Sequence, residues 1–551
     1  MGNTEKHSCI AVAEALRAAG IRHAVLSPGS RDVPMMTAME CCPDIETHVV
    51  VDERSAAFAA LGMAAASGNA VALVCTSGTA PLNYAPAVAE AYYRQIPLVV
   101  ITCDRPAAAI DRDLCQTIRQ PGIYANFIKE TFDIGTDDEA AAALYTACIA
   151  ASLALSAPQG PVHLNLRLDE PLGGMSDACP QFEPQISVAG APLAGDSLID
   201  EVARETAGRR VLIIAGSFAG GYISESLFNG QADVVVLSEL QSNLNRGCGG
   251  IIRDMDGTFG RLADKTAARP DVVITMGCSF VSGLIKKWLS SLPGLRHIHV
   301  GPRPFAPDTF GCLERCIPCE PLDFMSRLLA RLETDTSASP FRRLWTEAAE
   351  AARADSRRLL DSAPWCDFVA TGMLMDAIPA EYNLHLSNGM AVRYAQFFDS
   401  PHLGRCDCNR GVSGIDGSTS TAIGQALVSS SPTVLLSGDM SFQYDIGALS
   451  LRFIPPTMRM AVLNNGGGGI FDTIAATKTN PCGKRFFSDP MNLPLKDLCR
   501  AYGFDYYPVR SRAEMQATLP RWLAPALRPA VLDCITDSAT GAAILDKYLL
   551  K

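Results

Sequence analysis

Two neighbouring segments decide the fold of the C-terminal third: LLSGDMSF (435–442) and MAVLNNGGGGIF (460–471). Each begins as a short apolar run typical of a buried strand. The first run ends in Gly438 and Asp439, and the second ends in two asparagines and four glycines. Ligands of parallel α/β sheets bind at the carboxyl ends of the strands, magnesium takes about six hard oxygen ligands, and glycines let backbone approach phosphates closely. The two segments therefore indicate a site for a metal and a diphosphate. Two ordinary strand ends would give the same pattern.

The same alternation of short β-branched runs and alanine-rich helical stretches continues along the chain, which predicts an α/β fold of doubly wound parallel sheets. Two stretches rich in Pro, Gly, Ser and Asp, at 173–195 and 334–340, are predicted to be linkers. Three domains are therefore expected, at 1–178, 190–335 and 356–551. The candidate strands are His23–Leu26, His48–Val51, Ala72–Cys75, Leu98–Thr102, Val162–Leu166, Val211–Ala215, Val234–Leu237, Val272–Met276, His297–Val300, Leu384–Ser387, Thr433–Ser437, Met460–Asn464 and Ala530–Ile535.

Composition narrows the class of protein. The chain has 551 residues, of which 48% are hydrophobic and 19% charged, as in a globular protein of several domains. Its formal charge of −11 argues against nucleic acid or an anionic membrane as a partner. Glu5, Lys6 and His7 precede any apolar stretch, and no run reaches the length of a membrane span. A cytoplasmic location is expected.

Cysteine and histidine add two smaller indications. The 19 cysteines are an odd number without an export signal, which favours reduced thiols. Cys312, Cys316 and Cys319 have the spacing seen in radical iron–sulfur enzymes, but free thiols in a loop are the alternative that we favour. Only eight histidines occur, and none lies in the eight matched motifs quoted below, which argues against a catalytic triad or zinc hydrolysis.

A second motif, HVVVDERSAAFAALGMA (48–64), places Glu53 just after a predicted strand and at the start of a helix. A glutamate there could simply stabilise the first helical turn. Together with the segments at 435–471, however, it resembles the thiamine-diphosphate-dependent enzymes. The resemblance implies that Glu53 hydrogen-bonds the aminopyrimidine ring and favours the imino tautomer, whose nitrogen takes the proton from the thiazolium carbon.

The resemblance also implies the metal ligands. Asp439 and Asn465 would bind Mg²⁺ through their side chains and Gly467 through its backbone oxygen, and Mn²⁺ could replace Mg²⁺. Met440 stands at the third position of the superfamily's Gly-Asp-Gly motif, where glycine is expected, and this departure leaves the ligands intact.

Further motifs are similar to one family within that superfamily, the 2-succinyl-5-enolpyruvyl-6-hydroxy-3-cyclohexene-1-carboxylate synthases. The resemblance covers the first and third parts of the chain almost end to end and is weak in the middle. It implies an N-terminal pyrimidine-binding domain, a central domain and a C-terminal diphosphate-binding domain. The motifs are SPGSRDVPM (27–35), VDERSAAFAALGMA (51–64), TSGTAPLNYAPAVAEA (76–91), PLVVITCDRP (97–106), QTIRQPG (116–122), SNGMAVR (387–393), NRGVSGIDGSTSTAIG (409–424) and LNNGGGGIF (463–471).

This family implies a reaction and a substrate class. 2-Oxoglutarate would be decarboxylated, and the succinyl-semialdehyde carbanion equivalent would undergo 1,4-addition to isochorismate, a step of menaquinone biosynthesis. Both substrates are dicarboxylates, which bidentate arginines bind better than lysines do. An arbitrary arginine is more often a surface or ion-pair residue, so motif placement decides here. The substrate set is Ser30, Arg31, Arg105, Gln116, Arg393 and Arg410.

The cofactor set follows from the same motifs. Ile415 would prop the cofactor into its bent shape, and Ile470 and Phe471 would pack near it. Two departures from the family stand out. FVSGLIKKW (280–288) offers Lys286 or Lys287 where the family often has a Lys-Arg or Ser-Lys pair, and Gly389 stands where relatives have serine. The full set is Glu53, Gly389, Arg410, Ile415, Gly438, Asp439, Met440, Ser441, Asn465, Gly467, Gly468, Ile470 and Phe471.

The family resemblance further implies a homodimer, possibly a tetramer, with Glu53 of one subunit facing Asp439 and Asn465 of the other. Two alternatives stay open at this point. Another thiamine-diphosphate decarboxylase or carboligase would need an apolar substrate pocket. A catalytically silent paralogue would have lost Glu53, Asp439 or Asn465, and all three are present.

Overall fold

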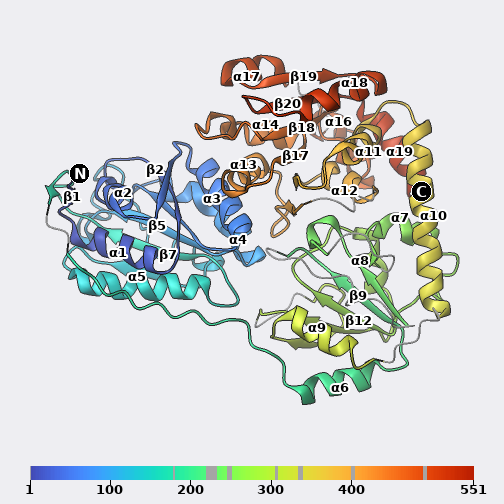
Figure 1. Ribbon diagram of the computed structural model, residues 1–551, viewed down its shortest axis with the longest axis horizontal. Helices are drawn as coiled ribbons and strands as arrows, with labels where there is room; N and C mark the ends of the chain where they lie inside the picture. The colour runs from blue at the N-terminus through green and yellow to red at the C-terminus, as the bar shows by residue number, and fades with distance from the viewer. Residues whose placement is uncertain are drawn as a thin grey trace. The chain divides into compact units, whose positions relative to one another are not determined.

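The computed structural model describes residues 2–177, 180–218, 233–244, 251–303, 308–332, 339–398, 404–487 and 493–550. Within these residues it has three six-stranded sheets, each wholly parallel and flanked by helices, so the α/β class expected from the sequence is confirmed (Figure 1). The chain forms two compact units. The first comprises 1–190, 411–430 and 445–455, and the second comprises 191–410, 431–444 and 456–551. The division into three domains stays a prediction.

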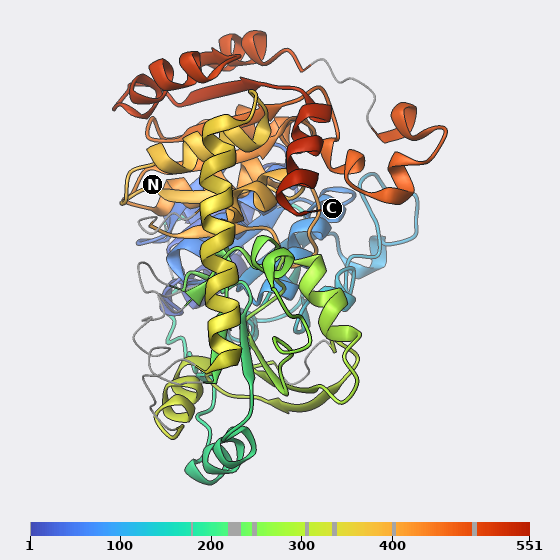
Figure 2. The same ribbon diagram turned by 90° about the vertical axis from the view of Figure 1, so that its right-hand side faces the viewer.

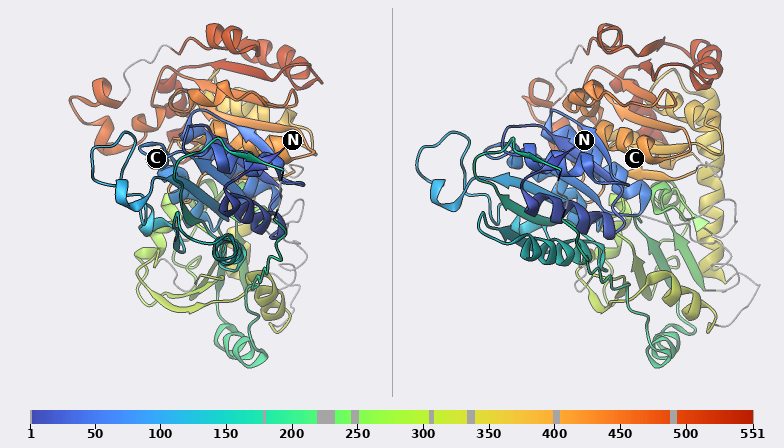
Figure 3. Two further views of the ribbon diagram at one scale, coloured as in Figure 1. Left: turned by 90° about the vertical axis from the view of Figure 1, so that its left-hand side faces the viewer. Right: turned by 60° about the vertical axis from the view of Figure 1, so that its left-hand side comes forward.

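The sheet of the first unit has the strand order β3-β2-β4-β5-β7-β6. Helices α1 (His7–Ala18), α2 (Val33–Cys41) and α5 (Ala140–Leu155) bury their apolar residues on one face of it. Helices α3 (Glu53–Ser67) and α4 (Ala80–Arg94) lie against the strands as well and pack on each other (Figure 3). The strands are β2 (His23–Ser27), β3 (Glu46–Val49), β4 (Val71–Cys75), β5 (Leu98–Asp104), β6 (Thr131–Ile134) and β7 (Val162–Arg167).

Glycines let α13 (Ser418–Val428) approach α3 closely, although the two helices are far apart in the sequence. A Cβ atom added at Gly62 would lie 2.0 Å from the Thr421 carbonyl oxygen, and one at Gly424 would lie 2.0 Å from that of Ala59. Gly417, just before α13, has φ 72° and leaves no room for a side chain beside the Phe58 ring. Part of the 409–424 motif is thus explained by helix packing.

The second unit contains two of the large sheets. In the sheet ordered β11-β10-β9-β12-β13-β14, helices α6 (Asp196–Thr206) and α9 (Pro321–Leu329) cover one face. Helices α7 (Met255–Arg261), α8 (Gly283–Ser290) and the long α10 (Pro340–Ser362) cover the other, and Figure 2 shows α10 running along the unit. The strands are β9 (Val211–Ala215), β10 (Val234–Leu237), β11 (Ile251–Ile252), β12 (Val272–Met276), β13 (Arg296–Val300) and β14 (Leu313–Ile317).

The other sheet of this unit is ordered β16-β15-β17-β18-β20-β19. Its core includes α11 (Asp367–Ala377), α12 (Met390–Gln396), α18 (Arg512–Leu523) and α19 (Ser538–Tyr548). The strands are β15 (Asn383–Leu386), β16 (Cys406–Cys408), β17 (Thr433–Gly438), β18 (Arg459–Asn464), β19 (Asp505–Val509) and β20 (Ala530–Ile535). The two sheets are joined through Asn243, whose amide exchanges two hydrogen bonds with the Cys406 backbone, of 2.8 and 3.0 Å.

The remaining elements are short, apart from one eight-residue helix. These remaining elements are β1 (Asn3–Thr4), β8 (Met175–Ser176), α14 (Asp439–Tyr444), α15 (Ala475–Lys478), α16 (Gly483–Phe487), α17 (Leu495–Tyr502), η1 (Ala107–Ala109), η2 (Ala125–Phe127), η4 (Leu240–Ser242), η5 (Ile446–Ser450) and η6 (Gly469–Asp472). No described helix is long and apolar enough to span a membrane.

Most expected strands form, and the differences have local reasons. The strand expected at His48–Val51 is Glu46–Val49, because the apolar letters Val50 and Val51 already belong to the turn into α3. The linker expected at 173–195 contains the two-residue strand β8, which pairs with β1. The other expected linker lies outside the described residues at 334–338, and α10 begins at Pro340.

Candidate active site

Glu53 stands at the carboxyl edge of the first sheet, as the first residue of α3 and four residues after β3. The N-cap of that helix is Asp52, whose carboxylate accepts hydrogen bonds from the Arg54 backbone N–H at 3.1 Å and the Ser55 hydroxyl at 2.9 Å. The capping role is therefore filled by Asp52. The half-buried Glu53 carboxylate is not the helix cap, so the structural role left for it is a favourable charge in the first turn of α3.

A second acid at the same edge was not predicted from the sequence. Asp32 is fully buried and accepts a hydrogen bond from the Gly29 N–H at 2.9 Å. Burial raises the pKa of Asp32 to about 7, and the negative charge of Glu53 adds to the rise. Asp32 lies within the 27–35 motif, so its position was a signal that the sequence analysis passed over.

The predicted substrate residues of the first unit differ in their surroundings. Arg31 is buried and already donates to the Leu168 carbonyl at 3.0 Å and to Glu170 at 3.1 Å. Arg105 directly follows β5, and its backbone N–H is held by Asp104 at 2.8 Å. Arg31 and Arg105 each keep a buried Nε–H without a partner within the described residues.

The two neutral members of that set are exposed. Ser30 precedes Arg31 in the loop after β2, and Gln116 adopts a left-handed backbone with φ 54°. Ile415 is half-buried in the turn before α13. A buried acid missed by the sequence analysis fixes this turn: Glu90 accepts hydrogen bonds from the N–H groups of Gly411 and Val412, both at 2.7 Å.

In the second unit, Asp439 begins α14 directly after β17 and is 3% exposed. One carboxylate oxygen accepts hydrogen bonds from the N–H groups of Gly466 and Gly467 at 3.0 and 2.9 Å, and the other accepts one from Met440 at 2.7 Å. Burial raises the pKa of Asp439, and these N–H groups oppose the rise. Consequently the loop after β18 is folded around the Asp439 carboxylate.

Asn465 is oriented by an acid that the sequence analysis missed. Its side-chain NH₂ donates to the buried Asp367 carboxylate at 2.7 Å, which leaves its amide oxygen on the side of the Gly467 N–H, 3.3 Å away. Thr536 also donates to Asp367. Burial raises the pKa of Asp367 to about 6, and the charge of nearby Asp439 adds to that.

The donors around this loop fit a hard divalent cation and a diphosphate. A carboxylate has about four lone-pair sites. The three N–H groups use only part of those on Asp439, so this carboxylate can still bind a metal. Gly466, Gly467 and Gly468 have φ values of 85°, 117° and 45°, a backbone that only glycine adopts readily. A side chain at Gly468 would collide with the Phe487 carbonyl oxygen.

The other predicted cofactor residues surround this loop in the second unit. The Gly438 N–H donates to the Ser387 hydroxyl at 3.2 Å, and Ser441 is buried in α14. Ile470 packs against the core of this sheet, and the Phe471 ring lies 5.0 Å from that of Phe487. Gly389 has φ 99°, a conformation that L residues rarely adopt, so a glycine suits the backbone at this position.

Three cations meet near the start of α12. Burial lowers the pKa of Arg393, and the positive charge of Arg410 lowers it further. Burial also lowers the pKa of Lys286, with Arg410 and Arg393 adding to the effect. Of the two lysines considered from the sequence, Lys286 is half-buried beside the arginines and Lys287 is exposed. We define Arg393, Arg410 and Lys286 as the basic cluster.

Two acids face the basic cluster. Glu239 is buried and accepts hydrogen bonds from the N–H groups of Val281 and Ser282 at 2.7 to 3.0 Å. Asp256 accepts one from the Ser282 hydroxyl, and both acids act on Arg393. The Arg410 guanidinium donates to Asn388 at 3.0 Å, whereas its Nε finds no partner in the described part of the chain.

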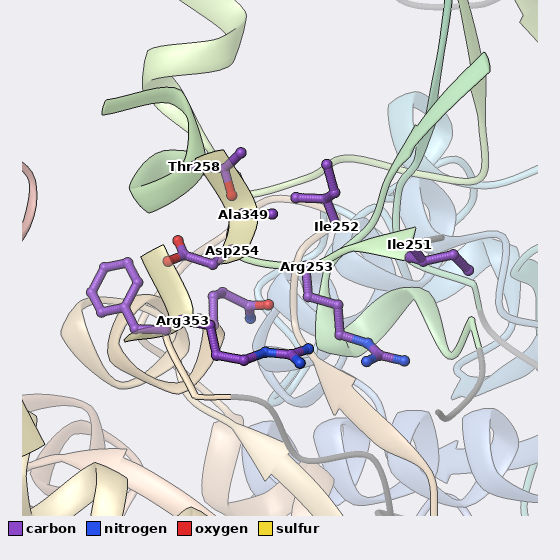
Figure 4. Close-up of a pocket in the computed structure, with 9 residues that line it drawn as sticks. Ile251, Ile252, Arg253, Asp254, Thr258, Ala349 and Arg353 are labelled. Atoms are coloured by element: carbon purple, nitrogen blue, oxygen red, sulfur yellow. The ribbon is translucent and has the colours of Figure 1, made fainter. Parts of the chain in front are cut away.

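A cavity of about 60 Å³ opens next to this region (Figure 4). Arg253 and Asp254 line it from one side and Arg353 of α10 from another. Its wall continues through Gln396 and Phe397 into a smaller space that Arg393 also lines. The second unit thus combines the Asp439 loop, the basic cluster and a cavity that has charged side chains in its wall.

The three cysteines singled out by spacing do not converge on one point within the described residues. Cys316 lies on β14 and not in a loop, which corrects that part of the expectation.

Comparisons with known proteins show to which family the chain belongs. Residues 10–123 match the family described as thiamine pyrophosphate enzyme, N-terminal TPP binding domain. A 2-succinyl-5-enolpyruvyl-6-hydroxy-3-cyclohexene-1-carboxylate synthase of Porphyromonas gingivalis is 36% identical, covering 96% of this chain and 94% of that protein. Synthases of the same name from Flavobacterium psychrophilum and Bacteroides fragilis are 35% and 33% identical, covering 96% and 99% of this chain and the same shares of their own lengths.

A solved benzoylformate decarboxylase of Polynucleobacter necessarius shares the fold, with a TM-score of 0.74, 16% identity, and coverage of 97% of this chain and 99% of that one. The identity is too low to say more than that. The level and extent of identity to the synthases are decisive, and this chain belongs to the thiamine-diphosphate-dependent 2-succinyl-5-enolpyruvyl-6-hydroxy-3-cyclohexene-1-carboxylate synthase family.

Proposed function

We propose that this chain, with thiamine diphosphate and Mg²⁺ bound, decarboxylates 2-oxoglutarate and joins the remaining four-carbon unit to isochorismate. The proposal rests chiefly on near full-length similarity to relatives that carry the synthase name. The basic cluster supports it, because three partly or fully buried cations suit two dicarboxylate substrates better than an apolar pocket would.

The metal is assigned to the loop around Asp439. Asp439 and Asn465 would bind Mg²⁺ through their side chains and Gly467 through its carbonyl oxygen, with diphosphate oxygens completing a set of about six. Asp367 acts on the metal indirectly, by holding the Asn465 amide so that its oxygen is presented. Mn²⁺ has the same preference for oxygen ligands and should replace Mg²⁺.

Thiamine diphosphate, when bound, supplies a carbon nucleophile and an electron sink for decarboxylation. Glu53, the first residue of α3, would hold a proton on the aminopyrimidine ring. Arg393, Arg410 and Lys286 bind and orient substrate carboxylates, and Arg31 and Arg105 are assigned to the same task. Ser30 and Gln116 would donate neutral hydrogen bonds, and Ile415 would press against the cofactor.

We place the enzyme in the cytoplasm as a homodimer in which two subunits build each site, Glu53 coming from one and Asp439 and Asn465 from the other. The family resemblance supports this assembly, with a tetramer as a further possibility. Closed two-fold symmetry would give two identical sites for each dimer.

The test is a comparison of donor substrates with the purified enzyme, thiamine diphosphate and Mg²⁺. With isochorismate present, 2-oxoglutarate should support isochorismate loss, and pyruvate should not. Decarboxylation of pyruvate without any use of 2-oxoglutarate would overturn the proposal in favour of another thiamine-diphosphate decarboxylase.

A further inference from the structure

Three side chains with metal-binding chemistry gather at the edge of the first sheet. His23 begins β2, and Glu46 and His48 lie on the edge strand β3. The strand register pairs His23 with Glu46 and Val25 with His48. Side chains two residues apart on a strand point to the same face, so the two imidazoles and the carboxylate project from one face of the β2–β3 pair.

Their separations suit a single bound ion. His23 Nδ1 lies 3.4 Å from His48 Nε2 and 3.7 Å from a Glu46 oxygen, and the other Glu46 oxygen lies 3.9 Å from His48 Nε2. Zinc lies about 2.0–2.2 Å from nitrogen and oxygen ligands, so tetrahedral ligands stand roughly 3.3–3.6 Å apart. The two nitrogens already stand at that spacing, and one ligand atom from each of the three residues lies within 4.8 Å of the others, so the Glu46 side chain has to move only a short way to complete the set.

The protonation states also favour a metal. Burial lowers the pKa of His23 and of His48, although the Glu46 charge opposes this in both cases. Neutral imidazole is the form that binds metals, so no proton has to leave at neutral pH. The His48 side chain is 6% exposed and its ring lies edge-on to Phe453, whereas the Glu46 side chain is 68% exposed. Solvent can thus reach the site from the Glu46 side.

We infer that His23, His48 and Glu46 bind one divalent transition-metal ion of the zinc class, with water in the open position. Imidazole ligands select zinc, nickel or copper, whereas magnesium takes oxygen ligands, so this site and the proposed Mg²⁺ site accept different ions. None of the three residues belongs to the proposed cofactor or substrate sets. A bound ion would tie the edge strand β3 to β2 and stabilise the segment that leads to Glu53.

The experiment titrates Zn²⁺ by calorimetry into the full chain loaded with thiamine diphosphate and Mg²⁺. Because cysteines also bind zinc, the readout is the difference between the unchanged chain and the variants His23→Gln and Glu46→Gln. Losing an outer partner of a ligand typically weakens metal binding about 10–100-fold, so losing a direct ligand should weaken it by about tenfold or more. Glu139→Gln, which removes an exposed carboxylate elsewhere in the same unit, should change nothing.

Cobalt substitution gives a second readout that does not depend on activity. Visible Co²⁺ bands from imidazole and carboxylate ligands should appear in the unchanged chain and in Glu139→Gln, and vanish in His23→Gln. Zn²⁺ should also raise the unfolding temperature only where the site is intact. Equal zinc affinity in all four proteins, or a cobalt spectrum dominated by thiolate bands that persist in His23→Gln, would overturn the inference and leave the three residues as a hydrogen-bonded cluster.

Discussion

At the scale of single residues, Glu53 carries the chemistry that is assigned to this chain. Replacing it by glutamine keeps the size of the side chain and removes the charge that holds a proton on the cofactor ring. We therefore expect Glu53→Gln to lose most turnover while thiamine diphosphate binding and the fold stay nearly unchanged. Steady-state rates and a cofactor titration measure the two quantities, and near-normal turnover would contradict the assigned role.

Asp367 offers a test of the metal-site geometry in which every proposed ligand is left unchanged. Asp367→Ala removes the acceptor that fixes the Asn465 amide, so Mg²⁺-dependent cofactor affinity should fall about 10–100-fold. The rate at saturating cofactor should change much less. Asp367→Asn retains an acceptor oxygen and is the matched control, with a smaller expected loss. Equal affinity in Asp367→Ala and the unchanged enzyme would show that Asn465 needs no such support.

Arg393 tests the basic cluster. A charge-assisted contact with a carboxylate contributes about 1.5–3 kcal/mol, so Arg393→Ala should reduce kcat/KM for the substrates roughly tenfold to somewhat over a hundredfold. Arg393→Lys keeps the positive charge beside Glu239 and Asp256 but loses the planar guanidinium fork. This variant therefore separates the contribution of the charge from that of bidentate hydrogen bonding. If Arg393→Ala unfolds more easily but turns over normally per folded molecule, Arg393 is a counter-ion for those acids.

At the scale of elements, the close approach of α3 and α13 makes a prediction about stability. Gly424→Ala places a methyl group against the Ala59 carbonyl oxygen, and overpacking of this kind costs about 1–3 kcal/mol. The free energy of unfolding, measured by denaturant titration, should fall by that amount. Gly283→Ala in α8 meets nothing within 4 Å and should be neutral or slightly stabilising. Equal effects of the two changes would refute the packing explanation.

The elements also show how far sequence reasoning reaches. Central strands such as β9, β12 and β20 were predicted to the residue, because a strand buried on both faces is a continuous apolar run bounded by polar letters. The edge strands β6, β11, β14, β16 and β19 were missed. β19 contains a proline and three partly exposed residues, and β16 is only three residues long, so neither has such a run.

For the candidate site, the sequence predicted that motif residues from two strand ends lie together, but not which residues support them. Asp439, Asn465 and Gly467 were placed together from two strand ends, and the structure joins them through hydrogen bonds. Asp367 and Glu239 lie in no motif, and Glu90 lies at the end of the 76–91 motif without a role assigned to it. They matter because folding brings them beside Asn465, Gly411 and Arg393 from distant parts of the chain, and a pairing of that kind leaves no local pattern in the sequence.

At the scale of the whole molecule, the proposed shared site predicts complementation between inactive chains. In a dimer of Glu53→Gln with Asp439→Ala, one site would carry both lesions and the other would carry neither. Random exchange makes half of the dimers mixed, so roughly a quarter of the original activity should return. If exchange is verified with a tagged subunit and no activity returns, each site lies within a single chain.

The central claim is that one active site couples decarboxylation of 2-oxoglutarate to consumption of isochorismate. The most direct measurement follows CO₂ released from 2-oxoglutarate labelled at C1 and isochorismate lost in the same reaction. We predict that the two amounts are equal throughout the time course and that both processes are absent in Asp439→Ala. Release of CO₂ while isochorismate stays constant, or loss of isochorismate without CO₂, would contradict the account.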